Sequence, residues 1–220
     1  MKRIALLALA SGMAIAAASP ANAALVIGYS VNGGTVTQLA NDTATPGSVS
    51  FAGTAGGYSF NTGALGTPNT ASVFDLLTQS INIQSSSNAA SVLNVFITET
   101  NLPTINGSLM SAFTSNILTN ATARISSFYS PSNALYGGTL LQTANFTNIG
   151  TFVGSNSGTQ AGPFSLTTRY DISFGAGSGT FNGTANLTAV PEPATWGMMI
   201  VGFGLMGGAL RRRKTTVAFA

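Results

Sequence analysis

The sequence predicts an all-β fold, an antiparallel β-sandwich of about eight to ten short strands, for residues 24–190. The chain contains 26 glycines, 45% of its residues are hydrophobic and only 6% are charged. Large apolar residues alternate with serine, threonine and asparagine, which is typical of strands that have one buried face. Turn signals rich in glycine, proline and asparagine separate these stretches. A disordered chain would contain few large apolar residues, so we favour a folded β domain.

The alternation is clearest near the end of this region. The residues expected to face inward are Leu166, Thr168, Tyr170, Ile172 and Phe174, and those expected to face solvent are Ser165, Thr167, Arg169, Asp171 and Ser173. Arg169 and Asp171 would then be neighbours on the solvent face, either as a surface pair or as part of a polar site. Residues 175–179 (GAGSG) predict a turn, and a second strand follows over 181–189, with Phe181, Ala185 and Leu187 inward and Asn182, Thr184, Asn186 and Thr188 outward. Together the two strands predict a β-hairpin.

Earlier strands are expected wherever β-branched and aromatic residues lie between turn signals. Their ranges are 25–29, 35–39, 48–52, 80–84, 91–98, 123–129 and 140–150. Residues 73–79 and 109–117 are less regular, and we expect short helices or irregular crossovers there.

Residues 1–23 have the three parts of a secretory signal peptide. Lys2 and Arg3 form the positive start, and residues 4–18 form the apolar region that follows them. Ala21 and Ala23 frame an A-x-A cleavage site. We therefore expect an N-terminal signal helix that signal peptidase removes after Ala23, so that residues 24–190 are exported.

The exported region carries little charge. The whole chain has a formal charge of +3, but most of its bases lie in the two ends. Residues 24–190 contain the bases Arg124 and Arg169 and the acids Asp42, Asp75, Glu99 and Asp171, a net charge of −2. Binding to nucleic acid needs clustered basic residues, so we expect no nucleic-acid partner.

We find no catalytic signature. The chain lacks histidine and cysteine, and its lysines, Lys2 and Lys214, lie in the targeting ends, so a serine nucleophile has no familiar base. The four acids are scattered without the spacing of a glycosidase pair. Asp42 is the only local hint of a calcium ligand, and it fits a turn better. We expect no enzyme activity, no metal and no cofactor.

The C-terminal segment 191–214 reads PEPATWGMMIVGFGLMGGALRRRK. Its first three residues are rigid, because proline fixes the backbone. Residues 194–210 carry no charge, and a helix of that length would be about 25 Å long, close to the thickness of a bilayer core. Cations at its end would remain on the cytoplasmic side and act as a membrane stop. These cations are Arg211, Arg212, Arg213 and Lys214. We therefore predict a transmembrane helix over 194–210 and a cytoplasmic tail over 215–220, in preference to a buried core helix.

This segment resembles the PEP-CTERM sorting signal of the PEPxxWA variety. The match consists of Pro191, Glu192, Pro193 and Trp196 at the family spacing, followed by the glycine-rich span and the arginine cluster. Gly197 departs from the alanine of that variety. The resemblance implies export in a Gram-negative host, transient anchoring in the inner membrane, and cleavage near the motif by an exosortase. The usual setting of the family is the cell surface, alongside exopolysaccharide production.

We therefore expect a non-enzymatic protein of the cell surface or extracellular matrix, linked to exopolysaccharide or biofilm. The alternative is a binding module for carbohydrate, in which Tyr58, Tyr129 or Tyr136 would contact polysaccharide, or, less favoured, for ice. Ice binding needs a flat array of threonines at every second position. The pairs Thr35/Thr37 and Thr98/Thr100 are isolated cases of that spacing.

Overall fold

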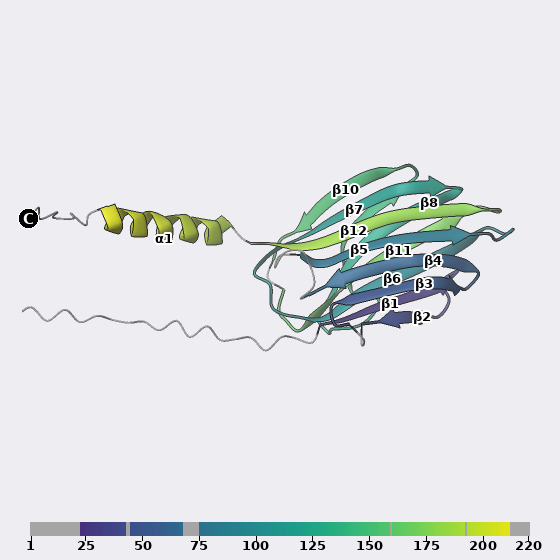
Figure 1. Cartoon of the computed structure of the whole chain (residues 1–220), viewed down its shortest axis with the longest axis horizontal. Helices are drawn as coiled ribbons and strands as arrows, with labels where there is room; N and C mark the ends of the chain where they lie inside the picture. The colour runs from purple at the N-terminus through teal and green to yellow at the C-terminus, as the bar shows by residue number, and fades with distance from the viewer. Residues whose placement is uncertain (1–22, 43–44, 68–74, 159, 192, 212–220) are drawn as a thin grey trace, which may run out of the picture.

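The protein consists of two six-stranded antiparallel sheets packed face to face, with one helix at the C-terminal end (Figure 1). The computed structural model describes residues 23–42, 45–67, 75–158, 160–191 and 193–211. Sheet A contains, in spatial order, β2 (Thr37–Asn41), β1 (Ala24–Val31), β6 (Ser91–Leu102), β11 (Phe164–Phe174), β8 (Ala121–Ser130) and β9 (Thr139–Phe146). Sheet B contains β10 (Gly150–Asn156), β7 (Gly107–Thr119), β12 (Gly179–Pro191), β5 (Asp75–Ser85), β4 (Tyr58–Gly66) and β3 (Ser48–Ala55). The predicted all-β sandwich is confirmed, with twelve strands described rather than eight to ten.

The core lies between the two sheets and is filled by alternate side chains of the strands. Tyr170 of β11 and Phe181 of β12 are both fully buried, and their ring centroids lie 6.2 Å apart across the interior. The inward faces predicted for these two strands are confirmed, because Thr168 and Ile172 are also buried, whereas Arg169 is partly exposed. The prediction that Ser165 and Thr167 face solvent is wrong, because both are fully buried. Burial of large side chains of this kind stabilises a fold by about 1.5–3 kcal/mol each.

The predicted hairpin between residues 166–174 and 181–189 is wrong. β11 pairs with β6 and β8 in sheet A, whereas β12 pairs with β5 and β7 in sheet B. The intervening turn carries the chain from one sheet to the other. Asn120 holds this turn, because its carbonyl accepts from Gly175 N at 3.0 Å and its Nδ2 donates to Ala176 O at 2.9 Å. Asn120 itself lies between β7 of sheet B and β8 of sheet A, where the chain also changes sheets. The turn after β11 is therefore held by a second connection between the sheets and does not close a hairpin.

Three further expectations need correction. Residues 109–117, predicted as a short helix or crossover, lie within β7, and residues 75–79 lie within β5, whereas 73–74 fall outside the described residues. In β7 the inward positions include Ser111 and Ser115, so serine on the buried face obscured the period of two. Residues 140–150, predicted as one strand, divide between β9 and β10, which belong to different sheets.

The C-terminal helix α1 (Pro193–Arg211) follows β12 and extends away from the sandwich (Figure 1). Its apolar side chains, including Ile200, Phe203 and Leu205, are exposed. Among the described residues, no helix combines the length and the apolar character that crossing a membrane requires. The prediction of a transmembrane helix over 194–210 is therefore not confirmed, although these residues lie within α1. Residues 1–22 of the signal helix predicted over 1–23, and the predicted tail over 215–220, lie outside the described residues.

The connection between β8 and β9 covers one end of the outer face of sheet A. Tyr136 N donates to Thr98 Oγ1 at 3.2 Å, and Ser165 Oγ donates to the carbonyl of Ala134 at 2.5 Å. The ring of Tyr136 lies so close to Gly28 that a Cβ there would be 2.8 Å from Tyr136 Cε1. Thr98 and Ser165, which this connection covers, are fully buried. At the other end of the face, Arg124 and Ser173 are exposed to solvent.

Candidate functional site

The sorting motif predicted from the sequence lies at the junction between β12 and α1. Pro191 is the last residue of β12 and is paired in register with Gly107 of β7. Pro193 begins α1, and Trp196 lies in its first turns. Glu192 falls outside the described residues, as do Ala21 of the predicted signal-peptide site and the predicted membrane-stop residues Arg212, Arg213 and Lys214. Arg211 is exposed at the end of α1, and Ala23 is buried beside the start of β1.

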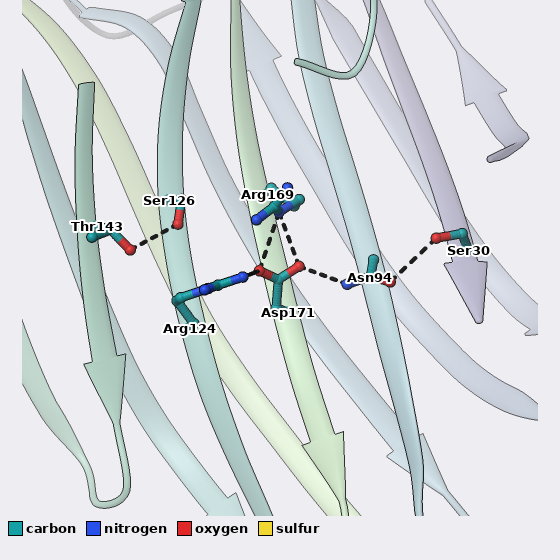
Figure 2. A network of polar contacts seen from close by, with 7 residues as sticks. All are labelled: Ser30, Asn94, Arg124, Ser126, Thr143, Arg169 and Asp171. Atoms are coloured by element: carbon teal, nitrogen blue, oxygen red, sulfur yellow. Dashed lines mark hydrogen bonds and ion pairs between the residues drawn. The ribbon is translucent and has the colours of Figure 1, made fainter. Parts of the chain in front are cut away.

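A charged cluster lies on the open end of the outer face of sheet A (Figure 2). We define it as Arg124, Arg169 and Asp171. Arg124 Nη2 lies 2.7 Å from Asp171 Oδ2, and Arg169 Nε lies 2.9 Å from Asp171 Oδ1. Asn94 Nδ2 donates to Asp171 Oδ1 at 2.6 Å, and Ser30 Oγ donates to Asn94 Oδ1 at 3.3 Å. The carboxylate of Asp171 therefore accepts from three different side chains.

The register of the sheet explains why these side chains meet. Asp171 of β11 lies directly opposite Arg124 of β8 and Asn94 of β6. Asn94 in turn lies opposite Ser30 of β1, so one polar row crosses four strands. Opposite charges on such cross-strand pairs contribute about 0.2–1 kcal/mol to stability.

An aromatic ring orients the second arginine of the charged cluster. The guanidinium carbon of Arg169 lies 5.1 Å from the ring centroid of Phe128, within the range of a cation–π contact. Next to it, the hydroxyls of Ser126 and Thr143 lie 2.9 Å apart (Figure 2). Packing against the ring and two interactions with Asp171 hold Arg169 in one orientation.

A hollow of about 440 Å³ opens beside the charged cluster on the same face. Arg124 and Asp171 line it, together with side chains that carry hydroxyl or amide groups. These polar lining residues are Asn94, Thr122, Asn145, Thr147 and Ser173. The hollow therefore offers a guanidinium and several neutral hydrogen-bonding groups on one surface.

Sequence reasoning found part of this site. The neighbouring positions of Arg169 and Asp171 were predicted, and their contact is confirmed. Arg124 and Asn94 were not assigned to it, because each reaches Asp171 across a strand pair that joins distant parts of the chain. The spacing of residues along the sequence cannot indicate pairs of this kind. The feature of the sequence that pointed to Arg124 was the scarcity of basic residues between positions 24 and 190.

The remaining acids do not converge with Asp171 on this face. Glu99 is fully buried in the sandwich, and burial raises the pKa of its carboxyl from 4.5 to about 8. Asp42 is also buried and accepts from Gly47 N at 2.9 Å, as expected for a turn residue. Among the residues that the structure describes, no three metal-binding side chains of the His, Cys, Asp or Glu types lie together.

The tyrosines considered for polysaccharide contact pack against the protein. Tyr58 is buried and donates from its hydroxyl to Ser91 Oγ at 2.6 Å. The ring of Tyr129 packs against Phe164 with centroids 5.2 Å apart. Tyr136 covers Gly28, and burial raises the pKa of its hydroxyl. Each of these rings therefore has a structural role in the sandwich or its covering segment.

A second hollow, of about 560 Å³, lies on the outer face of sheet B. It crosses five strands, and small residues in register form its centre: Ser50, Gly63, Ser80, Thr184 and Thr114. Its described lining includes neither a charged nor an aromatic side chain. Its described residues therefore offer a ligand neither a charged group nor an aromatic ring.

The threonine pairs considered for ice binding do not form an exposed array. Thr98 is fully buried with its Oγ1 2.8 Å from Thr167 Oγ1, and Thr100 is only 8% exposed. Thr35 and Thr37 are exposed, at the start of the edge strand β2.

Comparisons with known proteins were informative for the C-terminal segment. Residues 189–214 match the family model of the PEP-CTERM protein-sorting motif. No curated protein matches the sequence.

Three solved structures resemble the sandwich only distantly. TmCBM61, solved in complex with β-1,4-galactotriose, has a TM-score of 0.34 and 9% identity over 63% of this chain and 92% of that chain. Tailspike protein 4 of bacteriophage CBA120 has a TM-score of 0.35 and 9% identity over 61% of this chain and 20% of that chain. The K1 adhesin domain of Lys-gingipain from Porphyromonas gingivalis W83 has a TM-score of 0.32 and 10% identity over 65% of this chain and 97% of that chain. Likenesses at this level support no statement about function.

The matched residues begin near the end of β12 and continue through α1 into the arginine cluster. Their position agrees with the proline, tryptophan and arginine pattern of the sequence. Residues 189–214 of this chain are therefore a PEP-CTERM protein-sorting motif.

Proposed function

We propose that the chain is an exported, non-enzymatic protein of the cell surface or extracellular matrix. Exosortase-type machinery removes its C-terminal segment, and the β-sandwich remains as the functional body, with a role in exopolysaccharide or biofilm. The match of residues 189–214 to the PEP-CTERM motif carries this proposal.

The geometry of the junction supports removal of the segment. The described residues of the hydrophobic core lie between positions 25 and 189, and none of the described side chains of α1 belongs to it. The described apolar side chains of α1, such as Met198 and Leu205, are exposed rather than packed on the sandwich. Cleavage between β12 and α1 would therefore leave the buried contacts of the sandwich in place.

The arrangement of acids supports a non-enzymatic body. Asp171 is held by Arg124, Arg169 and Asn94, and Glu99 is enclosed in the core. A pair of carboxylates for general acid and base catalysis would have to face one substrate. Asp171 lies opposite Asn94 of β6, and Glu99 is an odd number of residues further along that strand. Since alternate residues of a strand point to opposite sides, Asp171 and Glu99 lie on opposite faces of sheet A.

Intact mass spectrometry of the protein from its native host tests the sorting role. We expect a mature form that begins at Ala24 and ends near Pro191, and we expect it to disappear when the sorting protease is deleted. Trp196→Ala should reduce the processed fraction, because it removes a motif residue. The neighbouring change Thr195→Ala is the matched control and should be processed like the wild type.

If the chain retains residues 191–220 in both the membrane and secreted fractions of the wild-type host, exosortase sorting is refuted. If the chain is processed normally after loss of the sorting protease, a different enzyme removes the segment.

A further inference from the structure

The two arginines of the exported region meet at one place. Arg124 and Arg169 are the only Lys or Arg residues in the sequence between positions 24 and 190, and both contact Asp171. Two guanidinium groups around one carboxylate leave one positive charge unbalanced. The rest of that region contributes only the acids Asp42, Asp75 and Glu99, so this positive site stands out in an otherwise neutral or acidic body.

Arg124 has hydrogen-bonding capacity to spare. Its Nε and Nη2 both donate to Asp171 Oδ2, at 3.0 and 2.7 Å. Its side chain is 50% exposed, whereas that of Asp171 is 11% exposed. A guanidinium has five N–H donors, and Nη1 of Arg124 has no partner among the described residues. The unused edge of Arg124 can therefore donate to a second carboxylate in the planar, paired geometry that arginine favours.

The hollow beside Arg124 suits a sugar ring. Thr122, Ser173 and Asn145 line it, and their side chains make no hydrogen bond to any described residue. Hydroxyl and amide groups can both donate and accept, which matches the hydroxyl groups of a carbohydrate. Concave sites with a few convergent polar groups are the usual form of small-ligand pockets.

We propose that this hollow binds a uronate residue of an acidic polysaccharide. The carboxylate of the uronate pairs with Arg124, and its hydroxyl groups bond to Thr122, Ser173 and Asn145. The unbalanced positive charge of the cluster selects an anionic sugar over a neutral one. This inference rests on the proposed extracellular location, because it names the polymer that the sandwich would meet there.

The hollow on sheet B is the competing site for a glycan. Its described lining carries no charge, so it would not distinguish acidic from neutral sugars. Thr184 lies at its centre and provides a variant that perturbs this hollow without changing charge. Binding at the charged cluster should depend on ligand charge and on Arg124, whereas binding at the hollow on sheet B should depend on neither and should be sensitive to Thr184.

Calorimetric titration of the full chain, purified in mild detergent, with oligogalacturonate tests the proposal. The fully methyl-esterified oligomer is the matched ligand, since it keeps the sugar but lacks the charge. Arg124→Gln should weaken binding of the acid form by about tenfold or more, because a charge-assisted hydrogen bond is lost. Arg124→Lys should fall between the two, because it keeps the charge but not the planar fork. Thr184→Ala should bind like the wild type.

Added salt should weaken binding of the acid form. Thermal unfolding of each variant checks that the half-exposed ion pair of Arg124 was removed without loss of the fold. The proposal is overturned if the acid form does not bind, if the methyl ester binds equally well, or if Arg124→Gln has no effect. Loss of binding in Thr184→Ala would assign the ligand to sheet B instead. Since binding is measured on the purified chain, these outcomes are independent of the mass measurement that tests sorting.

Discussion

Glu99 should make the stability of the sandwich depend on pH. The residue lies on β6 opposite Leu25 of β1 and Leu166 of β11, and its side chain is fully buried. Its Oε1 accepts from Thr67 N at 2.7 Å, whereas Oε2 has no hydrogen-bond partner. Burial is the main cause that raises the pKa of this carboxyl from 4.5 to about 8, and the charge of Asp42 adds to it.

The direction of the effect follows from proton binding. The folded protein holds the Glu99 proton up to a pKa of about 8, whereas the unfolded chain releases it near 4.5. The stabilisation is therefore complete below pH 4.5 and is lost as the pH rises through about 8. One pKa unit corresponds to about 1.4 kcal/mol, so the total change in the free energy of unfolding is roughly 5 kcal/mol. The chain has no histidine, so no other side chain with an ordinary pKa titrates in the middle of this window.

Urea-induced unfolding, followed by far-UV circular dichroism at several pH values, measures this dependence. The free energy of unfolding of the wild type should fall steadily as the pH rises from 5 to 8. Glu99→Gln keeps the shape of the side chain and cannot ionise, so its stability should change little with pH and exceed that of the wild type at pH 8. Parallel pH profiles for the two proteins would refute the reasoning.

Two further predictions concern packing and buried hydrogen bonds. Gly28→Ala should lower the free energy of unfolding by about 1–3 kcal/mol, because the new Cβ would press against the ring of Tyr136; an unchanged melting temperature would contradict this close contact. Thr168→Val should cost about 1–3 kcal/mol, because it leaves the amide of buried Gln79 without the hydroxyl that now lies 2.5 Å from Nε2. Adding Gln79→Leu should recover part of that loss, and a double-mutant cycle with no coupling energy would count against the bond between the sheets.

Local alternation predicted the strands that have strong contrast between their faces. In β11, large apolar residues such as Tyr170 alternate with Arg169 and Asp171, and the inward face was predicted correctly. β7 was missed because Ser111 and Ser115 occupy buried positions, which reduces the contrast between its two faces. Alternation with a period of two identifies a strand only where the buried positions are apolar and the exposed positions are polar.

The pairing of strands could not be predicted in the same way. β11 and β12 are adjacent in the sequence and alternate like a hairpin, but they belong to different sheets. Their alternation satisfies both arrangements equally well, since each strand buries one face in either case. The choice depends on which neighbours complete the backbone hydrogen bonds and fill the core between the sheets, and those neighbours are distant in the sequence.

The amino-acid sequence was sufficient for the all-β class and for the sorting motif, because both depend on short-range patterns: alternation along a strand, and Pro191 to Trp196 followed by cations. The charged cluster and its hollow required the folded sheet, since Arg124 and Asp171 are 47 positions apart and meet only through the register of β8 against β11. Backbone hydrogen bonds pair strands with little regard to side-chain identity, so register follows from packing both faces of the sandwich at once.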